Sequence, residues 1–314
     1  MASDSTRTVP NAATRLFKEK CPTRRAYVTL LAGNGDDLKG VEGLARGLRK
    51  VKSKYSLVVA ILPDVPEEHR KILKGLGCIV KVIRPVLYQP KEHAHLAATY
   101  PFLSNYSKLL IWQFEEYSKM MYLEGDTQVY GNIDFLFDSL DGYIHAPLDC
   151  FCTGAHEQWP ESFKWPKELG PKPLSYYSAS MFVFEPSTST SVNLLNNLRS
   201  ITRSQPIPFA EQHVFNMYFR KRLIPFSRYF YGELTMVDEK KNIDHLEEVM
   251  VLRYGSPQLR PWRHPPKMGN PEIANKLKRK WIDIYKDQSS DFQKQKSAKM
   301  KNFPKFPSAT SSSK

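Results

Sequence analysis

The sequence predicts an α/β fold in which a mostly parallel central sheet is covered by helices on both faces. Apolar strand-like runs alternate with helical patterns between Ala26 and Ile83, and this alternation requires right-handed crossovers between parallel strands. A further apolar run, residues 120–123, stops abruptly at Glu124-Gly125-Asp126. The 314 residues are 41% hydrophobic and 12% aromatic, which is enough to bury a large core.

The first part of the chain supplies three expected strands, at residues 26–32, 57–62 and 78–83. After the first strand comes a glycine-containing turn, and then Val41, Leu44 and Leu48 recur at helical spacing. Before the third strand, Asp64 or the proline that follows it can start a helix that carries Ile72 and Leu73. These elements together predict a parallel sheet of the doubly wound class.

The rest of the chain continues the pattern and then loses it. A helix is expected from about 105 to 117, with Leu109, Trp112 and Phe114 among its core residues, and it leads into the strand that ends at Glu124. Strands at 142–146 and 176–184 and a helix from about 190 to 199 follow. From about Asp287 the chain is too rich in Lys, Ser, Gln and Asn to form a core. We therefore expect a flexible segment at 1–24, one domain at 25–286 and a disordered basic tail at 287–314.

Composition excludes several classes of protein. Mean hydropathy is −0.47, no apolar run is long enough to span a membrane, and residues 1–25 contain no signal-like apolar segment, which predicts a cytoplasmic protein. The net charge of +14 is concentrated near the chain ends and accompanies no nucleic-acid motif, so nucleic acid is not expected as the main partner. The four cysteines fit neither a disulfide framework nor a zinc site.

The turn Glu124-Gly125-Asp126 is the strongest functional feature. Two carboxylates one residue apart at a strand end can hold a hard divalent cation, which in turn can hold a diphosphate. Such turns also occur on solvated surfaces, so the turn alone leaves both interpretations open. Its predicted position at the carboxyl edge of the sheet, where ligands of open α/β sheets bind, favours the metal site and a nucleotide-sugar donor.

Six strings, in the same order along the chain, carry a resemblance to a known family. They are Arg25-Ala26-Tyr27-Val28-Thr29, Leu62-Pro63-Asp64-Val65-Pro66, Asn105-Tyr106-Ser107-Lys108-Leu109, Met121-Tyr122-Leu123-Glu124-Gly125-Asp126, Met181-Phe182-Val183-Phe184-Glu185-Pro186-Ser187 and Pro208-Phe209-Ala210-Glu211-Gln212. From Arg25 to Trp262 the chain resembles the plant galactinol synthases, which are glycogenin relatives in the retaining glycosyltransferase family 8. The resemblance implies the GT-A fold, a single Rossmann-like domain, with Mn²⁺ as cofactor, UDP-galactose as donor and myo-inositol as acceptor.

The resemblance also implies a donor site. Glu124 and Asp126 would be the metal ligands, and Leu30 and Asn34 would lie along the uridine. Lys108 would face the donor phosphates or sugar as a catalytic residue, because a fixed cation stabilises the charge that accumulates on departing UDP. Residue type alone favours a different interpretation of Lys108, a solvated lysine on a helix surface.

Four further residues are implied around the sugar and the phosphates. Glu211 and Gln212 match an acidic-Gln pair near the reacting sugar carbon and would be catalytic, without an assigned nucleophile. Ser178 lies in the string that contacts the donor sugar, and Arg260 would bind phosphate as the family lysine does. Glu211 is also explained as a carboxylate that favours the start of a helix.

Departures from the family pattern cluster at the ligand site. Glu124 stands where the family has Asp, and Arg253 stands where it has a metal-binding His. An arginine cannot ligate a cation and repels one, although it can pair with a diphosphate directly. Asp37 replaces an aromatic residue expected to stack on uracil, and His213 replaces an Asp. Metal dependence is therefore in question.

Two functions from different classes remain. The first is a hexosyltransferase that moves galactose from a UDP donor to a small polyol such as myo-inositol. The alternative is a catalytically inactive paralogue that binds other proteins, including homo- or hetero-oligomers with active relatives. Matched site residues favour the enzyme: Lys108, Asp126, Gln212 and Arg260. Substituted site residues favour the alternative: Asp37, Ser178, His213 and Arg253.

Overall fold

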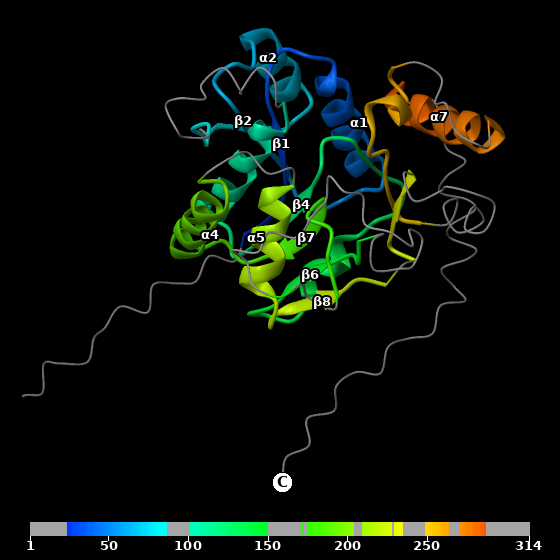
Figure 1. Ribbon diagram of the computed structural model, residues 1–314. Coiled ribbons are helices and arrows are strands. Elements are labelled where there is room, and N and C mark those ends of the chain that lie inside the picture. The colour runs from blue at the N-terminus through cyan, green and yellow to red at the C-terminus, as the bar shows by residue number, and fades with distance from the viewer. Residues whose placement is uncertain are drawn as a thin grey trace, which may run out of the picture.

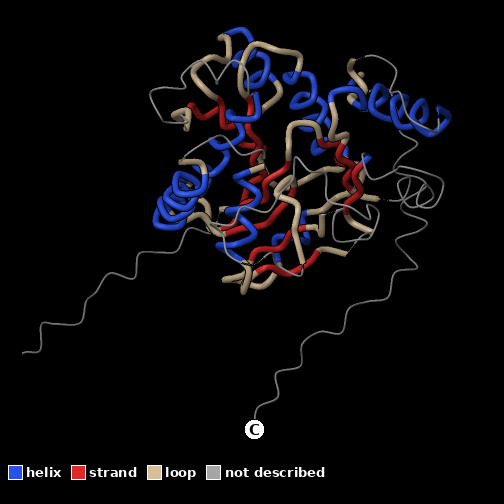
Figure 2. Tube along the Cα trace, viewed as in Figure 1, coloured by secondary structure: helices blue, strands red, loops and turns tan. Residues whose placement is uncertain are grey.

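A seven-stranded sheet with strand order β3-β2-β1-β4-β7-β6-β8 forms the centre of the molecule (Figures 1 and 2). The computed structural model describes residues 24–86, 101–149, 171, 175–203, 209–227, 229–234, 249–263 and 271–286. The strands of this sheet are β1 (Arg25–Leu31), β2 (Leu57–Ile61), β3 (Ile79–Val82), β4 (Lys119–Leu123), β6 (Ile144–Ala146), β7 (Met181–Phe184) and β8 (Leu223–Pro225).

The two halves of the sheet differ in strand direction. The strands β3, β2, β1 and β4 run parallel, as the alternation of strands and helices predicts. Strand β7 is antiparallel to β4 and β6, and β8 is parallel to β6. The predicted α/β fold with a mostly parallel sheet is confirmed. The antiparallel pairing of β7 with its two neighbours was not predicted from the sequence.

Helices cover both faces of this sheet (Figure 1). One core lies between the sheet and α1 (Asp37–Lys50) and α2 (Glu67–Gly75), where Tyr27 and Val59 pack on Leu44. The other core lies between the sheet and η2 (Pro101–Gln113), α4 (Thr188–Ile201) and α5 (Ala210–Phe219). Successive residues of β1 enter opposite cores, as the period of two of a strand requires.

A second, three-stranded sheet was not anticipated from the sequence. It has the order β5-β10-β9, with β5 (Thr127–Val129), β9 (Tyr231–Glu233) and β10 (Val251–Arg253). It packs with α7 (Pro271–Tyr285) in a small core that includes Tyr254 and Trp281. Because β5 follows the Glu124-Gly125-Asp126 turn directly, this sheet carries Arg253 to that turn.

Two predicted elements differ in form from those observed. The helix expected at 105–117 is a 3₁₀ helix that begins at Pro101 and ends at Gln113. It contains Ser107, whose hydroxyl accepts a hydrogen bond from the Val86 amide, and residues of this type weaken an α-helix. The strand expected at 176–184 is regular only from Met181, because a turn at residues 179–180 separates β7 from an isolated antiparallel bridge between Tyr177 and Leu148. Short 3₁₀ turns also occur at Asp134–Asp138 and Pro257–Leu259. Apart from Arg24, the segments predicted at 1–24 and 287–314 lie outside the described residues.

Close packing of α1 fixes the position of the acidic turn. A Cβ atom added to Gly40 would lie 2.4 Å from the carbonyl oxygen of Gly125 and 2.6 Å from the Trp262 ring. Gly47 similarly lies against the Gln128 side chain. The absence of side chains at these positions allows the helix to approach the backbone of the turn, so α1 forms one side of the site.

Candidate functional site

A polar pocket of about 280 Å³ lies at the carboxyl ends of β1 and β4. Leu30 from β1, the start of α1, and the Glu124-Gly125-Asp126 turn line it, together with Arg253 and the segment that follows β10. A larger hollow of about 1150 Å³ lies between β3, η2 and α4, and it contains none of the predicted site residues. The predicted carboxyl-edge position of the acidic turn is therefore observed at the smaller, more polar pocket.

The acidic turn is held by its backbone. Strand β4 ends at Leu123, the Glu124 amide donates to the Ser180 carbonyl over 2.9 Å, and the Thr127 amide donates to the Glu124 carbonyl over 3.1 Å. The Asp126 carbonyl accepts a 3.0 Å bond from the Tyr254 amide. With 5% of its surface exposed, Asp126 is buried, so the turn is not a solvated surface loop.

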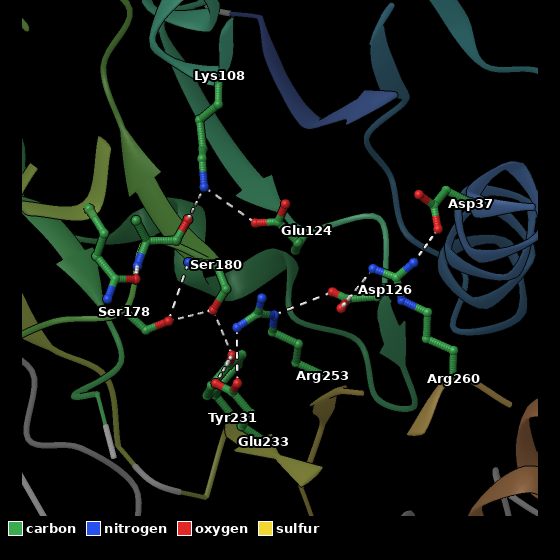
Figure 3. Close-up of polar contacts among 12 residues, drawn as sticks. Asp37, Lys108, Glu124, Asp126, Ser178, Ser180, Tyr231, Glu233, Arg253 and Arg260 are labelled. Atoms are coloured by element: carbon green, nitrogen blue, oxygen red, sulfur yellow. Dashed lines mark hydrogen bonds and ion pairs between the residues drawn. The ribbon is translucent and has the colours of Figure 1, made fainter. Parts of the chain in front are cut away.

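Arg253 occupies the space beside the acidic turn. Its Nε donates to Asp126 Oδ1 over 3.3 Å, and its Nη1 donates to Glu233 Oε1 over 2.9 Å. Figure 3 shows the guanidinium between these two carboxylates. Burial alone would lower the pKa of Arg253, but Glu233 and Asp126 hold it well above its usual value. The side chain is therefore a permanent cation at the position where the family pattern has a histidine.

A second arginine flanks the same carboxylate. Arg260 forms an ion pair with Asp37, and its Nη2 lies 3.9 Å from Asp126 Oδ2. The Nε of Arg260 is buried and has no hydrogen-bond partner among the described residues. Asp126 thus has one arginine near each of its oxygens, and Asp37, with half of its side chain exposed, is the carboxylate at the rim.

The two carboxylates of the turn differ in pKa. Burial raises the pKa of Glu124, but the charges of Lys108 and Arg253 outweigh this effect and leave it lowered. Burial also raises the pKa of Asp126, and Arg253 offsets this only in part, since Glu124 opposes ionisation. The surroundings therefore favour ionisation of Glu124 and oppose that of Asp126.

Lys108 connects the acidic turn with the expected sugar site. Its Nζ lies 3.4 Å from Glu124 Oε2 and 3.5 Å from Glu211 Oε1, and donates to the Ala179 carbonyl over 3.3 Å. Only 5% of the Lys108 side chain is exposed. The interpretation of Lys108 as a solvated helix lysine is therefore wrong, because three buried oxygens surround its ammonium group.

Gln212 is fixed at both ends of its amide. Its Oε1 accepts from the Ala179 amide over 2.9 Å, and its Nε2 donates to Asp149 Oδ2 over 3.0 Å. Glu211 and Gln212 stand in the first turn of α5, as predicted, and both are buried. Since Glu211 faces Lys108, its position reflects more than a preference for the start of a helix.

A chain of hydroxyl groups joins Ser178 to the acidic cluster. Ser178 and Ser180 share a 2.6 Å hydrogen bond, Ser180 shares another of 2.6 Å with Tyr231, and the Tyr231 hydroxyl donates to Glu233 over 3.2 Å (Figure 3). Ser178 is buried and does not line the pocket. The chain fixes Glu233, which in turn orients Arg253.

The two residues predicted along the uridine differ in position. Leu30 lies on the pocket wall at the end of β1. Asn34 is exposed on the turn between β1 and α1 and is not part of the lining. Trp262 contributes an aromatic ring to the wall near Gly40, on the side of Asp37.

His213 belongs to the support of the site and not to its surface. It is fully buried, and its Nδ1 shares a 2.8 Å hydrogen bond with the Tyr176 hydroxyl. Burial lowers the pKa of His213 to about 4. The imidazole is therefore neutral near pH 7 and supplies no charge to the neighbouring Gln212.

Three side chains of the site were missed from the sequence. Glu233, Tyr231 and Asp149 hold Arg253, Ser180 and Gln212 in place. Glu233 reaches Arg253 through the pairing of β9 with β10, which brings together residues twenty positions apart. No pattern in a single sequence marks such short strands. The only signal is that Tyr231 and Glu233, two positions apart, would lie on the same face of a strand.

The fit of the site to Mn²⁺ can be tested on its side chains. Enzymes of the GT-A fold generally use a divalent metal, and such ions need several oxygen or nitrogen ligands. Here one oxygen of Asp126 is bonded to Arg253, Glu124 is paired with Lys108, and a guanidinium stands at the third position. Within the described ranges, no group of three or more His, Cys, Asp or Glu side chains is arranged to hold a metal ion. The residues present do not fit the metal.

An α/β fold with a polar pocket at the carboxyl edge, lined by two arginines and three carboxylates, has the arrangement in which open α/β sheets bind their ligands. The model of glycosyl transferase family 8 matches residues 26–265. The chain therefore belongs to glycosyl transferase family 8, and the predicted family, enzyme class and GT-A fold are confirmed.

Relatives and solved structures agree with this assignment. The chain is 50% identical to galactinol synthase 2 of Solanum lycopersicum, over 89% of this chain and 85% of that protein. It is 49% identical to galactinol synthase 1 of Arabidopsis thaliana, over 86% and 81%. The galactosyltransferase LgtC in complex with donor and acceptor sugar analogs superposes with a TM-score of 0.55 at 15% identity, covering 81% of this chain and 95% of that chain. The LgtC likeness shows the fold.

Proposed function

We propose that this protein transfers galactose from UDP-galactose to myo-inositol and releases galactinol and UDP. The similarity to galactinol synthases over most of both chains supports the donor and the acceptor. The observation that carries the proposal is the position of Lys108, whose ammonium group lies between Glu124 and Glu211. In the proposed complex Glu124 would stand at the diphosphate end and Glu211 at the sugar end.

The reaction exchanges one glycosidic bond for another. The bond from the galactose C1 to the UDP phosphate breaks and leaves its electron pair on UDP, while an inositol hydroxyl forms the new bond to C1 and loses its proton. Negative charge grows on the leaving diphosphate, and a fixed cation in a buried site stabilises it. Lys108 would take this role from its position beside Glu124, and Arg260, which lines the pocket, would supply a second cation.

Glu211 and Gln212 would hold the sugar. The Gln212 amide is oriented by Asp149 and by the backbone of Ala179, so it can be presented to the sugar without a loss of rotamer freedom. Ser178 would support this wall through its bond to Ser180, and Leu30 would contact the uridine from β1. Asn34 could reach the uridine only from the exposed turn beside the pocket.

The remaining proposals concern the cellular location and the oligomeric state of the enzyme. In the described part of the chain, no helix is both long and apolar enough to cross a membrane. A cytoplasmic location stays a prediction. Homo-oligomers, or hetero-oligomers with active relatives, stay a prediction.

Product formation tests the proposed function. The full-length protein is incubated with UDP-galactose and myo-inositol, in buffers with Mn²⁺ and with EDTA, and the product is identified by mass spectrometry and by the anomeric coupling in its proton NMR spectrum. We expect an α-linked galactosyl inositol and an equal amount of UDP. Absence of product in both buffers would contradict the proposal and favour the non-catalytic alternative.

A further inference from the structure

We infer that Arg253, together with Arg260, binds the donor diphosphate directly and takes the place of a metal ion. The inference rests on the proposed function insofar as UDP is the donor. It concerns how this particular chain holds the diphosphate, and it follows from the misfit between the site and a divalent cation.

The position of Arg253 is fixed by three elements. In register, Arg253 of β10 pairs with Thr127 of β5 on one side and with Glu233 of β9 on the other. The first pairing places it directly after the acidic turn, and the second gives its guanidinium a buried carboxylate partner. A side chain held in this way cannot leave the site without abandoning both Asp126 and Glu233.

Arg253 has donors to spare. A guanidinium carries five N–H donors in a rigid fork that matches phosphate oxygens, and the contacts to Asp126 and Glu233 use Nε and Nη1. The side chain is 24% exposed and lines the pocket. The two carboxylates therefore orient the fork and leave its remaining donors for a ligand.

Arg260 provides the second half of the anion site. It approaches Asp126 from the oxygen opposite to Arg253, and its buried Nε is unpartnered among the described residues. Its ion pair with Asp37 lies at the rim, where half of the Asp37 side chain is exposed. A diphosphate oxygen can replace the Asp37 carboxylate, which is then free to turn into solvent.

The acidic residues of the site should weaken UDP binding. Carboxylates outnumber cations around the pocket, so a diphosphate binds well only if one carboxylate moves away from the arginines. Asp37 is the carboxylate that is exposed enough to do so. Removing its charge with Asp37→Asn should free Arg260 and tighten UDP binding severalfold. If UDP instead bound through a metal ion at Glu124 and Asp126, the same substitution would leave the dependence of UDP binding on that metal unchanged.

Calorimetric titration of UDP into the full-length protein, first with EDTA and then with Mn²⁺, tests the inference. The unsubstituted protein should bind UDP with the same Kd in both buffers. Arg253→Met should weaken binding in EDTA by about tenfold or more, the loss of one charge-assisted contact. Arg253→His, which supplies a metal ligand, should bind weakly in EDTA and gain affinity with Mn²⁺.

The control variant is Arg25→Met. The substitution removes the ion pair between Arg25 and Asp138, which lies outside the pocket, so UDP affinity should not change. Thermal unfolding of each variant checks that it is folded. Binding of UDP only with Mn²⁺, equal binding by Arg253→Met in EDTA, or no binding in either buffer would each overturn the inference. If UDP binds without metal but no galactinol forms, only the proposed transfer is contradicted. If galactinol forms only with Mn²⁺, only this inference is contradicted.

Discussion

At the scale of single residues, Lys108 shows how burial decides the role of a side chain. A lysine on a helix is usually solvated, but here its ammonium group faces Glu124 and Glu211 in a buried site. The sequence supplied the residue type and the resemblance supplied the role. The contacts that make the role physically plausible were visible only in the structure.

Replacement of Lys108 by Met should lower the kcat of transfer by about 10²–10³, the usual cost of removing one stabilising charge. The variant should also be less stable by about 3–5 kcal/mol, because Glu211 would remain buried without its partner. The matched control is Lys119→Met, since Lys119 is also buried and paired, with Asp141 away from the pocket. Rates are compared per folded molecule; a control that loses as much kcat as Lys108→Met would contradict the catalytic role.

His213 should make the stability depend on pH. Its pKa is about 4 in the folded protein and 6.5 when unperturbed, so between these values the unfolded chain binds a proton that the folded one does not. Stability is therefore lost as pH falls, by about 3 kcal/mol between pH 7.5 and pH 4.

Urea unfolding at both pH values measures this contribution. In His213→Asn, where the amide oxygen can still accept from Tyr176, the fall in unfolding free energy between the two pH values should be smaller by that amount. An equal fall in both proteins would show that His213 does not titrate as described.

At the scale of elements, the strands and helices that surround the pocket were largely predictable. The strands β1, β2 and β4 are mostly apolar runs, and α1 and α2 follow a glycine-containing turn and a proline, so their types and order are confirmed. The small sheet was missed because β5, β9 and β10 have three residues each. Its pairing joins segments more than a hundred positions apart, which no local pattern encodes.

The same limit applies to the site. The Glu124-Gly125-Asp126 turn and the pair Glu211-Gln212 could be placed because they begin or end regular elements. That Arg253 stands at the metal position followed from the resemblance. Its engagement with both Asp126 and Glu233 depends on the small sheet and could not be derived from sequence.

Gly40→Ala tests the contribution of α1 to the site. The added Cβ would lie 2.4 Å from the backbone oxygen of Gly125, which cannot move without shifting the acidic turn. We expect a loss of about 1–3 kcal/mol in unfolding free energy, as for overpacked cores, and weaker UDP binding. The control is Gly75→Ala at the end of α2, where nothing lies within 4 Å and a helical Ala is neutral or favourable. Unchanged UDP affinity in Gly40→Ala would show that α1 does not position the turn.

At the scale of the whole molecule, we predict that the two sheets and α7 act as one folding unit around the pocket. The last described helix buries Leu277, Trp281 and Ile284 against the small sheet, while the predicted tail begins after Lys286. A chain that ends at Lys286 should unfold at the same temperature as the full chain.

A chain that ends before Pro271 should be strongly destabilised, because each of the three buried side chains contributes about 1.5–3 kcal/mol. Differential scanning calorimetry of both truncations checks this. A large loss of stability in the longer truncation would show that residues after 286 belong to the domain.

We infer that this family 8 glycosyltransferase holds its donor diphosphate with arginines where the family pattern has a metal site. The most direct test is a crystal structure of the full-length protein with UDP and Mn²⁺, with anomalous scattering measured for manganese. We expect the diphosphate to lie between Arg253 and Arg260, with no manganese peak beside Glu124 and Asp126. A manganese peak between these carboxylates, with Arg253 displaced from Asp126, would contradict it.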